Sequence, residues 1–158
     1  MQASHFDEVH FFRAIHQSGA RALLIGRRAL VLLGLPVLTA DYDFWIAIDD
    51  IAVFNAAAAT VDLVPTIGPE DARRRGRYVL ENDEHVDVLV ARSIPTVAGQ
   101  PVAFEDLWRL RQPVTIAPGV EIQIPAIEGL IQTKQIALRP KDVEDIRLLR
   151  ISQEKDKP

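Results

Sequence analysis

Residues 39–48 read Thr-Ala-Asp-Tyr-Asp-Phe-Trp-Ile-Ala-Ile, and this stretch decides the fold. From residue 42 onward it is rich in residues that favour β-strands. Side chains alternate between the two faces of a strand. We therefore predict a strand over residues 42–48, with an apolar first face and a second face that carries a carboxylate. The first face would hold Tyr42, Phe44, Ile46 and Ile48, and the second Asp43, Trp45 and Ala47.

Two carboxylates lie close together at the start of this strand. Extended backbone at Asp41 places its side chain on the face of Asp43, about 7 Å away. Carboxylates this close repel unless a proton or a cation lies between them, and Mg²⁺ usually binds through one or two carboxylates plus substrate phosphates. An Asp-x-Asp pair can also serve only to satisfy backbone donors in a turn. The pair alone leaves both interpretations open.

A third aspartate lies in another predicted strand. Residues 77–80 and 85–91 are typical of a hairpin with a polar connection at 81–84. Asp87 is surrounded there by Val86, Val88 and Leu89, and a charge in such a strand needs a partner. A single strand aspartate is commonly a structural hydrogen-bonding group, but three in one small domain favour a functional site. We expect the three carboxylates to converge.

The other predicted elements alternate irregularly between strands and helices. Such a mixture with hairpins indicates an α+β fold in a single domain over residues 1–152, with a frayed tail at 153–158. A first helix is capped by Ser4, with Asp7 in the capping box, and stops at Gly19. Further strands are expected at 22–25, 114–116 and 120–124, and helices at 28–33, 50–60, 104–110, 126–138 and 140–151, with a helical turn from Pro69 and a loop around Pro95, Gly99 and Pro101.

Two features of the last helices allow more than one interpretation. Lys134 falls inside the apolar stripe formed by residues such as Leu130 and Ile131, so its ammonium must either reach the surface or meet an anion. Asp142 and Asp145 share a helix face, but a helix N-terminus favours acidic residues through its dipole alone. Trp45 could likewise stack on a base or simply pack in the core.

Composition excludes several classes of protein. The 158 residues are 48% hydrophobic and 25% charged, and they include no cysteine, so neither disulfides nor thiolate metal sites can form. The start lacks the pattern of a secretion signal, and the apolar stretch at 29–40 is too short to span a bilayer, so we expect a cytoplasmic protein without a membrane segment. A net charge of −4 disfavours general polyanion binding. The arginine-rich residues 71–77 could contact RNA locally or be merely solvated.

Several of these motifs together, in their order and spacing, resemble the minimal nucleotidyltransferases of the DNA polymerase beta superfamily, especially the abortive-infection type nucleotidyltransferase toxins. Residues 23–26, followed by Ala29 and Gly34, resemble the family's opening strand, small-residue turn and helix. Residues 39–44 are similar to its Thr-x-Asp-x-Asp signature, and residues 85–89 to its third-aspartate strand. Residues 127–134 and 139–146 resemble its lysine helix and the following Arg-x-Lys-Asp-x-x-Asp motif.

The resemblance implies a nucleotidyltransferase fold, with a small mixed sheet flanked by helices, and it implies roles for the residues. Asp41 and Asp43 would hold Mg²⁺ or Mn²⁺ and the nucleotide, and Asp87 would hold a second metal or deprotonate the acceptor. The substrate would be a nucleoside triphosphate such as ATP, the acceptor a tRNA, a protein or a small molecule, and an antitoxin a further partner. The nucleotide-binding residues would be Gly26, Arg27, Thr39, Lys134, Lys141 and Asp142.

Two departures from the family pattern bear on activity. Arg27 replaces a second small residue, although a backbone that approaches phosphates normally lacks a bulky side chain. Residues 36–38, Pro-Val-Leu, replace the arginine that often precedes the signature. Three hypotheses therefore remain: a Mg²⁺-dependent nucleotidyltransferase, a catalytically silent binding or toxin-antitoxin protein with the same fold, and an antibiotic-modifying nucleotidyltransferase.

Overall fold

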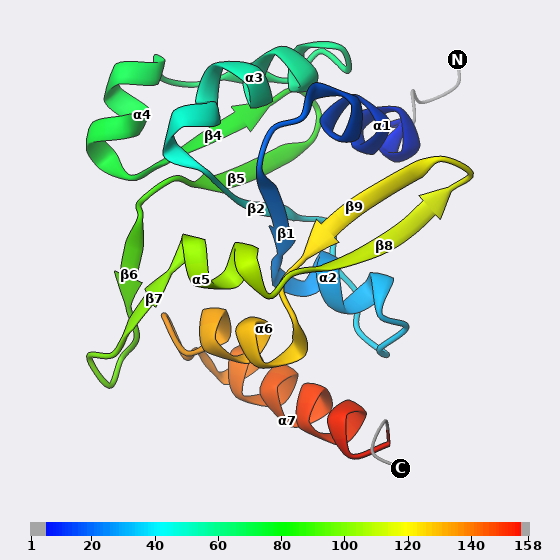
Figure 1. The fold of residues 1–158 in the computed structure, drawn as a ribbon, viewed down its shortest axis with the longest axis vertical. Helices are drawn as coiled ribbons and strands as arrows, with labels where there is room; N and C mark the ends of the chain where they lie inside the picture. The colour runs from blue at the N-terminus through cyan, green and yellow to red at the C-terminus, as the bar shows by residue number, and fades with distance from the viewer. Residues whose placement is uncertain (1–5, 156–158) are drawn as a thin grey trace.

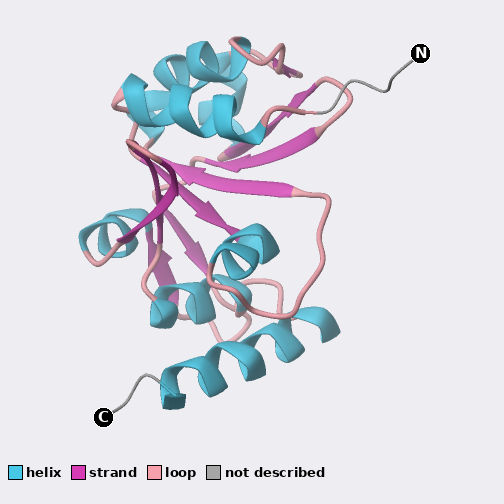
Figure 2. Ribbon diagram, turned by 90° about the vertical axis from the view of Figure 1, so that its right-hand side faces the viewer, coloured by secondary structure: helices cyan, strands magenta, loops and turns pink. Residues whose placement is uncertain are grey.

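The structure is a computed structural model that describes residues 6–155, in which a seven-stranded mixed sheet is covered by helices on both sides (Figures 1 and 2). The strand order in the large sheet is β3-β4-β5-β2-β1-β9-β8. The helices are α1 (Glu8–Ser18), α2 (Gly26–Leu32), α3 (Ile51–Ala59), α4 (Pro69–Arg75), α5 (Phe104–Arg109), α6 (Ile127–Lys134) and α7 (Pro140–Lys155), with a 3₁₀ turn at Ile48–Asp50. The strands are β1 (Ala22–Ile25), β2 (Tyr42–Ile46), β3 (Val64–Pro65), β4 (Arg77–Glu81), β5 (His85–Leu89), β6 (Ser93–Pro95), β7 (Pro101–Ala103), β8 (Gln112–Ala117) and β9 (Val120–Ile124).

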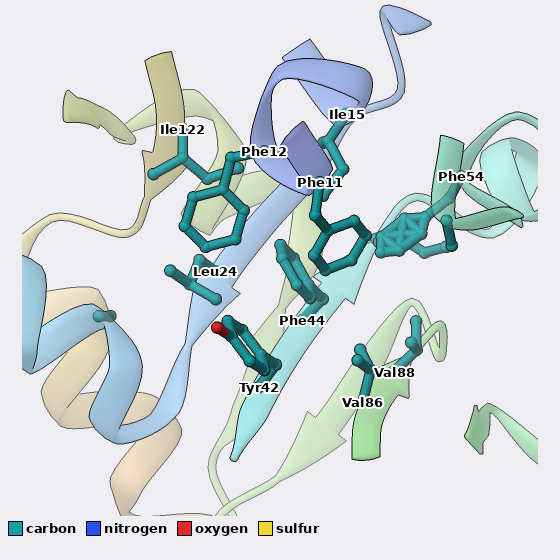
Figure 3. Close-up of a cluster of buried hydrophobic side chains, with 14 of the residues drawn as sticks. Phe11, Phe12, Ile15, Leu24, Tyr42, Phe44, Phe54, Val86, Val88 and Ile122 are labelled. Atoms are coloured by element: carbon teal, nitrogen blue, oxygen red, sulfur yellow. The ribbon is translucent and has the colours of Figure 1, made fainter. Parts of the chain in front are cut away.

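The centre of the sheet is β2, which pairs antiparallel with β1 and parallel with β5. Its apolar face packs on α1 and α3, where the rings of Phe11 and Phe54 lie 5.7 and 5.2 Å from that of Phe44 (Figure 3). Its opposite face carries Trp45, which is fully buried in a second apolar cluster with Phe104 of α5. The predicted alternation is therefore confirmed from Tyr42 to Ile46, but the strand ends there, and Ile48 begins the 3₁₀ turn instead of continuing the apolar face.

Trp45 packs in the core rather than stacking on a ligand. Its indole Nε1 donates a hydrogen bond of 2.9 Å to the carbonyl of Ala91, which satisfies its polar group inside the protein. No part of its side chain is exposed. The packing interpretation holds, and the base-stacking alternative is wrong for this structure.

Most predicted elements are present, and several of them differ at their ends. Asp7 caps the first helix, since its carboxylate accepts a hydrogen bond of 2.9 Å from the His10 backbone N–H; the predicted cap, Ser4, lies outside the described residues. The helix predicted over 126–138 ends at Lys134, ahead of Leu138 with its left-handed φ of 48°. Helix α7 continues to Lys155, so residues 153–155 of the predicted frayed tail are helical, and residues 156–158 are not described.

A small two-stranded sheet occupies the segment predicted as a loop. Strands β6 and β7 pair antiparallel around Pro95 and Pro101, which suits the edge positions where a strand tolerates proline. In the described part of the chain, no helix has the length and apolarity needed to cross a membrane.

Candidate functional site

The three aspartates approach one another because two neighbouring strands run parallel. Asp43 of β2 is the register partner of Asp87 of β5, so both side chains project from the same face of the sheet about one strand spacing apart. Asp41 precedes β2, and its backbone N–H donates a hydrogen bond of 3.0 Å to Thr39 Oγ1. This turn brings the third carboxylate to the end of the strand that carries Asp43.

Gly26 forms the wall against which Asp43 lies. Strand β1 ends at Ile25, the register partner of Asp43, and α2 begins at the next residue. Gly26 has a φ of 70°, and a Cβ built on it would lie 2.5 Å from Asp43 Oδ2. Both the backbone conformation and the missing space require glycine here. The small-residue turn predicted from the sequence therefore serves to bring a backbone against a carboxylate.

Asp43 is the electrostatically strained member of the group. Burial raises its pKa to about 6, with further contributions from the charges of Asp87 and Asp41, while Lys134 and Lys141 act in the opposite direction. A buried acid among like charges gains most from a bound cation. A cation bound beside Asp43 would therefore favour its ionised form at neutral pH.

One cleft of about 570 Å³ is lined both by the three aspartates and by residues of the two C-terminal helices. Its volume lies within the range of sites for small molecules and cofactors. All nine residues that the sequence analysis assigned to metal or nucleotide line it, which places them together without testing their roles. They are Gly26, Arg27, Thr39, Asp41, Asp43, Asp87, Lys134, Lys141 and Asp142.

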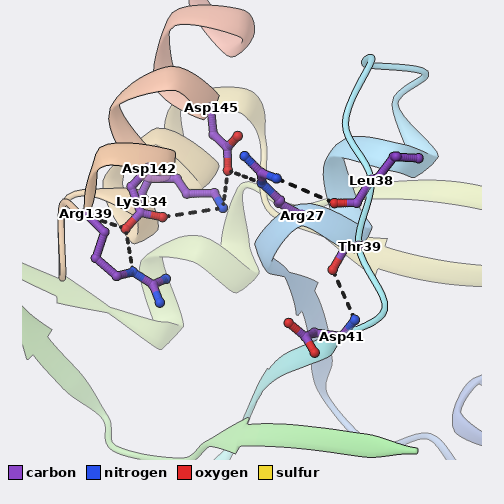
Figure 4. Close-up of polar contacts among 8 residues, drawn as sticks. All are labelled: Arg27, Leu38, Thr39, Asp41, Lys134, Arg139, Asp142 and Asp145. Atoms are coloured by element: carbon purple, nitrogen blue, oxygen red, sulfur yellow. Dashed lines mark hydrogen bonds and ion pairs between the residues drawn. The ribbon is translucent and has the colours of Figure 1, made fainter.

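Lys134 finds its anion within the protein. Its side chain is only 6% exposed, and its Nζ lies 2.9 Å from Oδ2 of the fully buried Asp145 (Figure 4). Arg27 Nε reaches the same oxygen at 3.1 Å, and the other oxygen, Oδ1, has no hydrogen-bond partner in the described structure. Neither snorkelling nor a bound triphosphate is needed to explain Lys134, so the expectation that its anion must come from the substrate is corrected.

Arg27, which stands where the family pattern has a small residue, makes specific contacts of its own. Besides Asp145, its guanidinium lies 3.5 Å from the carbonyl oxygen of Leu38, in the loop before the signature (Figure 4). It therefore connects α2 to α7 and to this loop. Asp142 Oδ1 also lies 3.7 Å from Lys134 Nζ, so Arg27 and Lys134 face two carboxylates, and this wall of the cleft carries a single net positive charge only when Arg139, the partner of Asp142, is included.

Asp142 is held by the residue before its own helix. Its Oδ2 accepts hydrogen bonds from the backbone N–H of Arg139 at 2.9 Å and from the Arg139 Nε at 3.0 Å. The first of these satisfies a backbone donor at the start of α7, as in one half of a capping box. Burial opposes the ionised form of Asp142, but the hydrogen bonds from Arg139 outweigh it and hold its pKa below the usual range.

Four residues at or beside the cleft were missing from the predicted site. Asp145 was explained by the helix dipole, although its position three residues after Asp142 placed both on one face. Arg139 was noticed only as part of a motif. Arg75 and Arg77 belong to the arginine-rich stretch, and only the fold shows that these two, and neither Arg73 nor Arg74, line the cleft.

The carboxylates suit a hard divalent cation but do not form a finished cage. Among residues 6–155, no three Asp, Glu or His side chains are placed to hold a metal ion by themselves. Mg²⁺ usually takes only one or two protein carboxylates and completes its shell with phosphates and water. Asp41, Asp43 and Asp87 offer the oxygen donors that such a cation prefers, and a bound ion would need further ligands from outside the protein.

Comparison with known proteins shows the fold. No protein-family model matches the sequence, and no curated protein matches it. The structure is similar to TM1012 of Thermotoga maritima, assigned as a nucleotidyltransferase, with a TM-score of 0.60, 15% identity and coverage of 92% of this chain and 89% of that one. It is also similar to the antibiotic-resistance factor ANT(2'')-Ia (TM-score 0.62, 14% identity, coverage 91% and 80%) and to lincomycin-bound LnuA, a lincosamide antibiotic adenylyltransferase (0.61, 12%, 93% and 98%). The predicted α+β nucleotidyltransferase fold is confirmed.

Proposed function

We propose that this protein transfers a nucleoside monophosphate from a nucleoside triphosphate to a hydroxyl group, with Mg²⁺ held by Asp41, Asp43 and Asp87. One observation carries the proposal. Asp43 lies between the Gly26 backbone and Asp87 of the neighbouring strand, in the same cleft as Lys134. A neutral residue at position 43 would stabilise the fold better than a carboxylate whose pKa is raised by burial and by like charges. The presence of Asp43 there therefore favours a functional interpretation.

The reaction follows from these positions. The acceptor oxygen attacks the α-phosphorus, the bond from that phosphorus to the oxygen bridging to the β-phosphate breaks, and pyrophosphate leaves. Asp87 has an exposed carboxylate and would take the proton of the acceptor hydroxyl. Bound Mg²⁺ would stabilise the charge that develops on the phosphate oxygens. Arg27 and Lys134 would supply positive charge on the opposite wall, where Asp145 fixes their positions.

A second candidate is a catalytically silent protein with the same fold, as in a toxin-antitoxin pair. One observation favours it: Arg27 connects Asp145 and the Leu38 carbonyl at the edge of the cleft, where a nucleotide would have to pass or displace it. A third candidate, an antibiotic-modifying enzyme, shares the chemistry of the first. The fold of LnuA and ANT(2'')-Ia does not choose the acceptor.

The test is label transfer from each of the four α-labelled nucleoside triphosphates, with total tRNA, total protein or buffer alone, and with or without Mg²⁺. We expect a Mg²⁺-dependent labelled product that decreases at least about 100-fold in Asp43→Asn, because the metal contribution amounts to several kcal/mol. Asp49→Asn removes an exposed carboxylate outside the cleft and is the matched control.

Nucleotide binding separates the candidates if no product forms. Mg²⁺-dependent binding of a triphosphate that Asp43→Asn abolishes, without label transfer to any acceptor, would support the silent protein. Absence of metal-dependent nucleotide binding by the wild type would contradict the proposed function.

A further inference from the structure

A second group of positive charges lines the cleft on the side away from Lys134. Arg75 ends α4 and Arg77 begins β4, and both side chains are exposed in the cleft. Within residues 6–155 the guanidinium group of neither arginine makes a hydrogen bond or an ion pair. The preceding Arg73 and Arg74, by contrast, pair with Glu70 and Asp71 of the same helix and lie outside the cleft. Two uncompensated cations therefore face the interior of the site.

The order of the strands separates this pair from the triphosphate wall. Gly26 follows β1, whereas Arg77 lies in β4, three strands away and so roughly 14 Å across the sheet. Figure 1 likewise shows α4 and β4 at the opposite end of the molecule from α6 and α7. The carboxylates of β2 and β5 lie between the two positive walls. A triphosphate at Gly26 and Lys134 would leave the second wall without a partner.

Arg77 lies on the same face of the sheet as Asp87. Its register partner is Leu89, and residues two apart on a strand share a face, so Arg77, Leu89 and Asp87 all project to the same side. The intervening Tyr78 faces the buried core instead. The second positive wall therefore adjoins the carboxylate that we assign to the acceptor.

We propose that the acceptor is a nucleic-acid strand whose backbone phosphates bind Arg75 and Arg77 and whose terminal hydroxyl reaches Asp87. This inference rests on the proposed function and names its acceptor class. A chain of net charge −4 has little general affinity for polyanions, so contact with a strand must come from a local group of this kind. The same two arginines would repel a polycationic acceptor such as an aminoglycoside, which argues against that class of antibiotic as the acceptor.

The test measures binding of fluorescein-labelled single-stranded RNA and single-stranded DNA to the full-length protein, without nucleotide and without Mg²⁺, at about 50 to 200 mM salt. We expect binding of at least one strand that weakens with salt. The double variant Arg75→Ala/Arg77→Ala should lose at least about 10-fold in affinity and reduce the salt slope by about 1 to 2, because two phosphate contacts are removed. The two probes show whether the sugar also matters.

The matched control is Arg73→Ala/Arg74→Ala, which removes the same charge from α4 but outside the cleft. We expect its affinity to stay within about two-fold of the wild type, because those arginines are already paired. Equal losses in both double variants, or no binding of either strand by the wild type at low salt, would overturn the proposal. Since the assay contains neither nucleotide nor metal, its failure is independent of the Asp43 experiment that tests nucleotidyl transfer.

Discussion

The two faces of the central strand β2 differ in what they contribute to the protein. On one face, Phe44 packs among the aromatic rings of Phe11 and Phe54, and burial of this apolar surface stabilises the fold. On the other face, Asp43 lies partly buried beside two more carboxylates, an arrangement that costs stability. Packing of the aromatic face therefore offsets the cost of gathering the carboxylates on the acidic face of the same strand.

The largest change is expected from breaking the aromatic face at Phe54. Its side chain is fully buried against Phe44 and lies outside the cleft. Phe54→Ala should lower the free energy of unfolding by about 3 to 5 kcal/mol, because a ring is removed and a cavity remains. Urea denaturation measures the loss. Val53→Ala, at a neighbouring position that is 40% exposed, should cost less than about 1 kcal/mol. Similar losses in both variants would show that this face is not the one that holds the strand.

A smaller but more selective change is expected where the backbone meets the acidic face. In Gly26→Ala, a methyl group would lie 2.5 Å from the resting position of Asp43 Oδ2, in a residue whose φ is already 70°. We expect stability to fall by about 1 to 2 kcal/mol from backbone strain, and label transfer to fall at least about 10-fold because Asp43 must move.

Gly34→Ala separates these two effects. Gly34 has a φ of 80° and would gain a Cβ with nothing within 4 Å, so it carries the backbone strain without the contact. Its stability should fall by a similar amount, with label transfer unchanged. If both glycine variants lose label transfer equally, the close approach of Gly26 to Asp43 has no part in the reaction.

The sequence predicted one side of this comparison better than the other. The alternation along β2 determines which side chains share a face, so the aromatic core followed from local pattern, whereas the approach of Asp43 to Asp87 also requires that β2 and β5 pair in parallel. The ion pair between Lys134 and Asp145 could not be predicted from local pattern, because it depends on how α6 packs on α7. A lysine within an apolar stripe indicates only that an anion is needed, not which one supplies it.

The same reasoning explains why the second positive wall was missed. The short stretch 73–77 contains four arginines, and sequence alone gives no reason to assign two of them to the cleft and two to the surface outside it. The division arises because α4 pairs the first two with its own acids and ends at Gly76, whose left-handed backbone turns the chain into β4. Pairing of β4 with β5 then determines that the Arg77 side chain lies on the face of the sheet that carries Asp87. This pairing is a tertiary property that the local sequence does not specify.

The smallest expected effect is a pH dependence that isolates the cost of the acidic face. The pKa of Asp43 is about 6 in the folded protein, compared with the ordinary value of 3.8 that applies to the unfolded chain. Between pH 3.8 and pH 6 the folded state therefore binds more protons than the unfolded state. Stability from this group is therefore fully present below about pH 4, falls as the pH rises through 6, and stays low above it. A shift of two pKa units corresponds to about 3 kcal/mol, and partial exposure to solvent reduces this to on the order of 1 to 2 kcal/mol.

Asp43→Asn should remove this fall, because the amide does not titrate. The variant should match the wild type near pH 4 and exceed its free energy of unfolding at pH 7, while its label transfer should be strongly reduced. Urea denaturation at both pH values, without divalent metal, measures the difference, and Asp83→Asn in the β4–β5 turn should keep the wild-type profile. Adding Mg²⁺ at pH 7 should then stabilise the wild type and not Asp43→Asn, because a cation can replace the proton only where the carboxylate remains. If Asp43→Asn is less stable than the wild type at pH 7, this carboxylate stabilises the fold. The acidic face would then contribute to stability as the aromatic face does, which would contradict the cost assigned to it.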